Sequence, residues 1–182
     1  ATCGELAKGF ARVRCVECRA EQLVAYSCKD RGLCPSCTGR RAAETAAHLI
    51  DAVLPEVPMR QYVLALPFEW HGRVAADPSL ESALLAGFHL ELAAFQRAQV
   101  GRGAEAQPGS VTFLQHFGST LNLHVHFHVL ALDGVYVPGE DGAPRFVRAP
   151  RPTRTQLGAL LGRVARRLRG IAETSASRDP EE

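Results

Sequence analysis

The sequence predicts an α+β protein in which a small cysteine-rich ribbon precedes an antiparallel sheet with flanking helices. Cys-x2-Cys pairs lie near the N-terminus, and the later segments alternate between the two-residue period of strands and the 3.6-residue period of helices. Three histidines also occupy alternate positions of one apolar, strand-like run. We expect a ribbon over residues 1–41, a larger domain over 42–172 and a disordered tail over 173–182.

The ribbon is predicted from the spacing of its cysteines. The two pairs are separated by fifteen residues, a spacing typical of four-cysteine zinc sites. All six cysteines lie in the first 37 residues, and no leader or long apolar span is present, so a disulfide framework is disfavoured. We expect a cytoplasmic, nucleoid-associated bacterial protein with no membrane partner. The expected ligands of a structural Zn²⁺ are Cys15, Cys18, Cys34 and Cys37, with Cys3 and Cys28 unassigned.

Short strands are expected on either side of the first cysteine pair, over Ala11–Arg14 and Gln22–Ser27. An alanine-rich helix follows over Arg40–Val53, with Ala43, Ala47, Ile50 and Leu54 at helical spacing. Residues 60–66 then alternate as a strand that Pro67 ends. Asp77-Pro78-Ser79 predicts the start of a long helix, whose apolar stripe is Leu80, Leu84, Phe88, Leu92 and Phe95.

The centre of the sheet is expected from Ser110–Phe117 and His124–Leu132. Asp133-Gly134 predicts a two-residue hairpin turn directly after the second of these strands. Val135–Val137 and Arg145–Val147 predict a further short hairpin. A last helix is expected over Thr153–Arg169, with Leu157, Leu160, Leu161, Val164 and Leu168 facing inward.

The histidine run predicts a metal site. Because side chains alternate along a strand, His124, His126 and His128 line one face while apolar residues line the other. Histidines two apart lie about 6–7 Å apart at Cα, close enough to hold one cation, whereas the outer two lie about 13 Å apart. His126 is therefore paired either with His128 or with His124. Gln115 or His116, on the preceding strand, is the expected third ligand, and the spacing does not choose between them.

Charge is distributed unevenly along a chain whose net charge is only +2. Residues 1–41 and 143–182 are basic, whereas residues 42–142 are acidic. The basic segments contain mostly arginine, whose planar fork suits phosphate. They predict a phosphate-facing surface, with a solvated basic face as the plain alternative. The residues expected to contact DNA are Arg40, Arg41, Arg145, Arg148, Arg151 and Arg154.

Three blocks of the sequence resemble the rolling-circle transposases of the insertion-sequence ninety-one type, which are HUH endonucleases. The first block runs from the cysteine pairs through Arg40-Arg41-x2-Glu44-Thr45-Ala46-Ala47-His48-Leu49. The second runs from Leu54-Pro55 to Leu66-Pro67, with Arg60-Gln61-Tyr62 inside it. The third contains Phe117-Gly118-Ser119, His126-Phe127-His128 and Leu132-Asp133-Gly134-Val135-Tyr136. The resemblance covers most of the chain.

The resemblance implies an HUH-type catalytic domain that cleaves and rejoins single-stranded DNA in transposition. His126 and His128 match the family's positions for Mg²⁺ or Mn²⁺, and His124 and Gln115 rank below them. The family's nucleophilic tyrosines lie on a helix beyond the histidine strand, where this chain has only Tyr136, a weak candidate. We therefore expect a truncated copy that lacks the nucleophile. Single-stranded DNA is the expected partner, and a homodimer the expected assembly.

Two other functions are compatible with these motifs. The first is a zinc-ribbon DNA-binding module without catalytic activity, in which the histidines bind no metal. The second is a zinc-dependent hydrolase that uses the histidine strand, although such barrel folds need more strands and a further His or Asp ligand. Binding of a divalent metal at the histidine strand separates the first alternative from the transposase.

Overall fold

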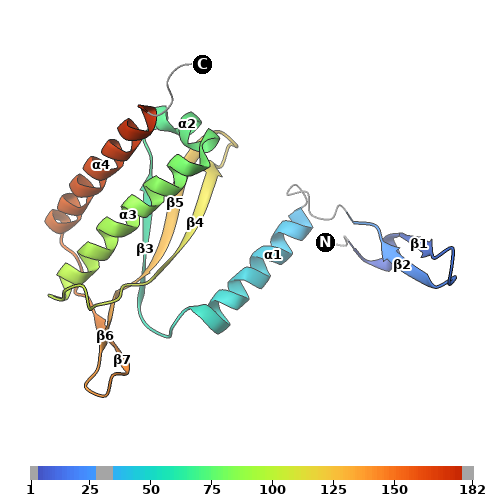
Figure 1. Cartoon of the computed structure of the whole chain (residues 1–182), viewed down its shortest axis with the longest axis horizontal. Coiled ribbons are helices and arrows are strands. Elements are labelled where there is room, and N and C mark those ends of the chain that lie inside the picture. The colour runs from blue at the N-terminus through green and yellow to red at the C-terminus, as the bar shows by residue number, and fades with distance from the viewer. Residues whose placement is uncertain (1–3, 28–34, 178–182) are drawn as a thin grey trace. The chain divides into compact units, whose positions relative to one another are not determined.

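The computed structural model describes residues 4–27 and 35–177, and the chain forms two compact units, Ala1–Glu56 and Val57–Glu182 (Figure 1). Each unit contains its own antiparallel sheet or sheets together with helices. The α+β class expected from the sequence is therefore confirmed. Among the residues so described, no helix combines the length and the apolar character needed to cross a membrane.

A two-stranded hairpin forms the first part of the N-terminal unit. A short 3₁₀ turn (η1, Leu6–Lys8) leads into β1 (Phe10–Arg14), which pairs antiparallel with β2 (Glu21–Ala25). These strands confirm the two expected from the sequence. None of the described residues of this hairpin is buried, so it lacks an apolar core of its own.

A helix completes the N-terminal unit. It comprises α1 (Pro35–His48) and a π-helical turn (η2, Leu49–Val53), which confirms the predicted helix and starts it five residues earlier. Proline suits such a start because the first turn leaves its N–H groups unbonded anyway. The residues at helical spacing do not form a buried stripe: Ala43 and Ala47 are exposed, and Ile50 is 70% exposed. A hairpin of two five-residue strands is too small to cover a helix of this length.

The C-terminal unit is built on a three-stranded antiparallel sheet. Its order is β3 (Met59–Ala65), β5 (Leu123–Leu132) and β4 (Ser110–Phe117), so the histidine strand β5 is central. One face of β5 presents Val125, Phe127 and Val129, all fully buried. These residues pack against α3 (Pro78–Gln99) and α4 (Arg154–Ala176), which both cover this face. The face that carries His124, His126 and His128 is therefore the opposite one, which these two helices do not cover.

The long helix α3 forms as predicted. The Asp77 carboxylate accepts hydrogen bonds from the N–H groups of Ser79 and Leu80, which caps the helix. All five residues of the predicted stripe are buried, with exposed fractions of 5% or less. Gly87 allows α4 to approach closely, because a Cβ at this position would lie 2.7 Å from Ile171 Cδ1.

The last helix differs from the prediction in its end and in its inward face. A capping box joins Thr153 and Gln156 at its start. The helix continues past Arg169 to Ala176, so residues 173–176 do not belong to a disordered tail. Leu161 is 64% exposed and Leu157 40% exposed, against the prediction, because only a narrow row of α4 meets α3 and the sheet. That row is Leu160, Val164, Leu168 and Ala172.

A second hairpin leaves the end of the sheet. It consists of β6 (Gly134–Pro138) and β7 (Pro144–Arg148), as predicted. The prediction of a hairpin turn at Asp133-Gly134 is wrong, because Gly134 begins β6 and pairs with Arg148 rather than reversing the chain. Glycine is needed here because a Cβ would lie 2.2 Å from the Val147 carbonyl oxygen. The Asp133 carboxylate instead binds Arg60, with Nη2 to Oδ1 at 2.6 Å.

Candidate metal and nucleic-acid site

The first cysteine pair forms the turn between β1 and β2. Cys15 donates its N–H to the Ala20 carbonyl at 2.9 Å and accepts from the Arg19 N–H at 3.1 Å. Arg19 closes this knuckle in the left-handed conformation, with φ of 59°. Cys34 lies outside the described residues, and so does the Cys37 side chain at the start of α1. The knuckle therefore presents two of the four predicted zinc ligands.

The knuckle also promotes metal binding electrostatically. Hydrogen bonds from the backbone N–H groups of Cys18 and then Glu17 lower the pKa of the Cys15 thiol, and the Cys18 side chain lowers it further. Because the thiolate is the form that binds metals, a lowered pKa favours binding near neutral pH. Both cysteines are exposed and form no disulfide, so they are accessible to an ion.

The three histidines of β5 share the open face of the sheet, as predicted. Strand register places His128 between Val63 on β3 and Phe113 on β4, and places His126 between Ala65 and Gln115. The His126 ring centre lies 4.8 Å from that of His124 and 4.9 Å from that of His128. The imidazoles thus form a continuous row along the face. We call this row, together with Val63, Ala65, Phe113 and Gln115 beside it, the histidine face.

Hydrogen bonds determine which ring nitrogens of this row are available. His126 is buried, and its Nδ1 lies 2.6 Å from the His124 carbonyl oxygen. Since a carbonyl only accepts, Nδ1 carries the proton and Nε2 keeps a lone pair that can bind a metal. His128 Nδ1 lies 3.0 Å from the Gln61 side-chain amide. The atom that faces His128 Nδ1 is the amide nitrogen of Gln61, which donates, so Nδ1 accepts this hydrogen bond; a metal at His128 Nε2 requires the amide to turn over so that its oxygen accepts from Nδ1–H.

The two expected third ligands lie in different places. Gln115 lies on the histidine face beside His126, and its amide nitrogen donates to the Phe117 carbonyl at 3.1 Å. The proposal of His116 as a ligand is wrong, because His116 Nε2 lies 2.6 Å from a carboxylate oxygen of Glu81 on α3. Alternation along β4 turns this imidazole toward the helices. Among the residues that the structure describes, no three His, Cys, Asp or Glu side chains are grouped to hold one ion.

A fourth imidazole, that of His71, joins the row although no motif had marked it. His71 follows a 3₁₀ turn (η3, Phe68–Trp70) and starts a short helix (α2, His71–Ala76), neither of which was predicted. Its ring centre lies 5.1 Å from that of His124, and it is 3% exposed. A single histidine after an exposed turn shows no periodicity in sequence. Only the crossover from β3 to α3 brings it to β5.

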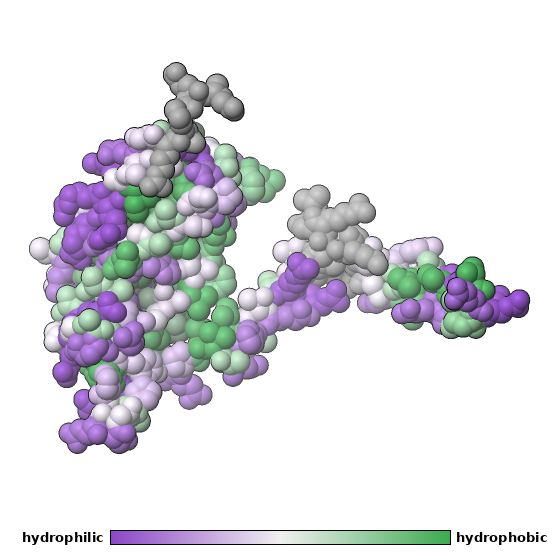
Figure 2. Space-filling model, in the orientation of Figure 1, coloured by the Kyte–Doolittle hydropathy of each residue, from purple (hydrophilic) through white to green (hydrophobic). Residues whose placement is uncertain are grey.

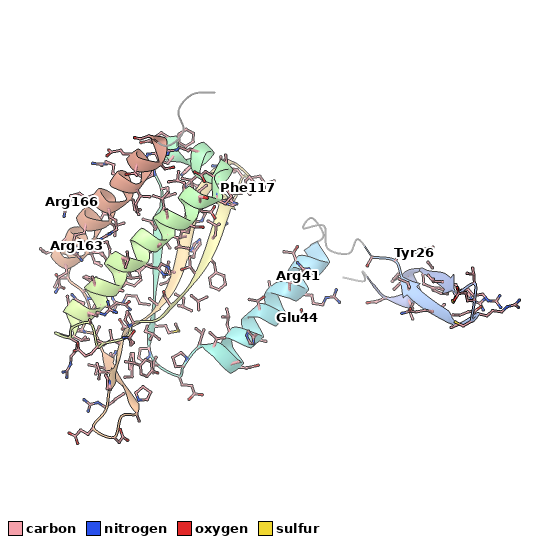
Figure 3. The ribbon with its side chains drawn as sticks, viewed as in Figure 1. Tyr26, Arg41, Glu44, Phe117, Arg163 and Arg166 are labelled. Carbon is pink, nitrogen blue, oxygen red and sulfur yellow. The ribbon has the colours of Figure 1, made fainter. Side chains whose placement is uncertain are left out.

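The predicted DNA-contacting arginines lie in both units. Arg40 and Arg41 are exposed on α1, and Figure 3 labels Arg41. The other four are exposed along β7, the segment that follows it and the start of α4, and they are Arg145, Arg148, Arg151 and Arg154. In contrast, Arg163 and Arg167 of α4 both bind the Glu91 carboxylate, whose pKa Arg167 and Arg163 lower. Figure 2 shows hydrophilic residues gathered over the outer side of α4.

Comparison with protein families identifies the chain. Residues 1–66 match the family described as "Transposase zinc-binding domain", and residues 109–180 match the family described as "Putative transposase". The two matches define a transposase with an N-terminal zinc-binding domain. More particularly, the chain belongs to the transposases of the IS91 type, so its role lies in DNA transposition and its partner is DNA. No curated protein and no solved structure matches the chain.

Proposed function

We propose that the C-terminal unit holds single-stranded DNA at the histidine face together with Mg²⁺ or Mn²⁺, as an HUH-type transposase domain. The observation that carries this proposal is the pairing of His126 and His128 on one open sheet face, with His126 Nε2 left as a lone pair. When bound, such an ion polarises a phosphate and so favours attack at phosphorus.

The surroundings of the two histidines suit a nucleotide. Val63 and Phe113 flank His128 and are 56% and 46% exposed, which leaves an apolar aromatic surface beside the proposed ligands. Bases of single strands stack on such surfaces, whereas a duplex keeps its bases paired. Mg²⁺ and Mn²⁺ need few protein ligands when phosphate oxygens complete the coordination. Two imidazoles and a DNA phosphate therefore form a sufficient set.

The zinc-hydrolase alternative receives less support. Catalytic zinc sites use three protein ligands and keep one position open. The described part of the chain offers no such group of three. The alternative of a DNA-binding module with silent histidines remains, and metal binding separates it from the proposal.

Removing His126 tests the proposed metal site. We expect His126→Ala to abolish Mn²⁺ binding in the presence of a single-stranded oligonucleotide, because it deletes the imidazole whose Nε2 is free. Mn²⁺ electron paramagnetic resonance measures the bound fraction directly. His116→Ala is the matched control, since it removes an imidazole that binds Glu81 instead. Mn²⁺ binding that survives His126→Ala would favour the silent-histidine module.

The arginines of β7 and the α4 start provide a second test. We expect Arg148→Ala, Arg151→Ala and Arg154→Ala together to flatten the salt dependence of single-stranded DNA affinity, because each phosphate contact adds about 0.7 to the logarithmic slope. Fluorescence anisotropy at several salt concentrations measures the slope. The same three residues changed to Lys retain the charge, so this control keeps the wild-type slope. An unchanged slope in the Ala variant would exclude this surface.

A further inference from the structure

We propose that His71 and His124 form a second cation site at one end of the histidine face, selective for a divalent transition metal such as Co²⁺, Ni²⁺ or Zn²⁺. This site does not depend on the proposed DNA function, because it uses neither His128 nor a phosphate. It joins α2 to the start of β5, two elements that are distant from each other in the sequence.

The hydrogen bonding of His71 matches the pattern of a metal-binding histidine. Its Nε2 lies 3.0 Å from the Leu66 carbonyl oxygen, so Nε2 carries the proton. Its Nδ1 is then a lone pair, and this buried atom has no hydrogen-bond partner. Buried polar atoms are nearly always satisfied. Histidines that bind metals commonly donate their other ring N–H to a backbone carbonyl, as His71 does.

His124 provides the second imidazole at a suitable distance. A metal bound at 2.0–2.1 Å from each nitrogen, in tetrahedral geometry, separates two ring centres by about 5 Å. The observed separation of His71 and His124 is 5.1 Å. The Phe68 ring packs edge-on against the other side of His71 at 5.6 Å, which restricts the movement of its imidazole.

The donor set indicates which ions fit. Two neutral imidazoles with neither a carboxylate nor a phosphate beside them suit borderline transition metals and disfavour Mg²⁺, which requires oxygen ligands. Since the described residues place no third His, Cys, Asp or Glu ligand here, water completes the coordination. The site therefore binds its metal more weakly than a four-cysteine zinc site does, and the bound ion exchanges with ions in solution.

The decisive experiment uses the full chain with its N-terminal zinc loaded and with no DNA present. In a His128→Ala background, which removes the other proposed pair, we expect one Co²⁺ per chain by isothermal titration, with visible ligand-field absorption. Adding His71→Phe or His124→Phe should weaken Co²⁺ binding at least tenfold. At position 71 phenylalanine keeps a ring beside Phe68, and at both positions it deletes the ring nitrogens.

Each outcome decides the proposal. Absence of Co²⁺ binding in the His128→Ala background overturns it, and so does binding that His71→Phe leaves unchanged, which would assign the ion to His124 and His126. Circular dichroism checks that each variant folds. If His71→Phe does not fold, His124→Phe decides, because His124 is only half-buried on an open face. Mn²⁺ binding in the presence of DNA is measured separately, so a negative result with Co²⁺ does not contradict the proposed HUH function.

Discussion

We expect chelation of zinc, or the substitution Cys15→Ser, to unfold the N-terminal hairpin while the C-terminal unit remains folded. The hairpin has no buried residue to stabilise it, and Phe10, Val13 and Leu23 are each close to half exposed. Figure 2 shows hydrophobic residues on the hairpin surface. In small zinc domains the metal contributes about 10–16 kcal/mol, and this binding energy is also folding energy. The predicted set of four ligands, Cys15, Cys18, Cys34 and Cys37, would link the knuckle to the start of α1.

Hydrogen exchange with mass detection measures this effect separately in each unit. We expect the amides of β1 and β2 to lose protection on chelation and those of β5 to keep it, since β5 lies in an apolar core of its own. Metal analysis should give one zinc per chain. Val16→Ala is the matched control, because Val16 lies in the same turn and is 93% exposed. Hairpin protection that persists after chelation would contradict the prediction.

The second large effect that we expect is the absence of strand transfer: the chain should form no covalent adduct with single-stranded DNA and Mn²⁺. Tyrosine attack needs a hydroxyl about 3 Å from the phosphorus. Tyr26 lies in the N-terminal hairpin (Figure 3). Tyr62 packs against the helix-covered core on the other face of the sheet, and desolvation raises its pKa, which further disfavours the reactive phenolate. Tyr136 packs against Phe146, with ring centres 5.4 Å apart.

A denaturing gel of the chain with a labelled oligonucleotide measures the adduct. We expect free DNA only, at any Mn²⁺ concentration. An adduct that disappears in Tyr136→Phe and persists in Tyr62→Phe would make Tyr136 the nucleophile. Such a result would also require the β6–β7 hairpin to leave the packing seen here.

The sequence alone determined the features that depend on local periodicity. The stripe of α3 and the alternation of β5 follow from spacing within one segment, and both are confirmed. The first cysteine pair likewise forms a turn through hydrogen bonds that stay within six consecutive residues, Cys15 to Ala20. These features were predictable because a side chain's face is set by its own helix or strand.

Only the tertiary structure decided which distant residues meet. The sequence makes His116 a candidate ligand, but the packing of α3 places Glu81 beside it. The sequence likewise makes Asp133 a turn residue, but β3 places Arg60 beside it. His71 had no signal in sequence, yet the crossover from β3 places it beside His124. Each of these contacts joins residues on separate elements, and their distances depend on how whole elements pack. Local spacing therefore predicted the face that the histidines of β5 share, while the packing of α2 and α3 determined their further partners.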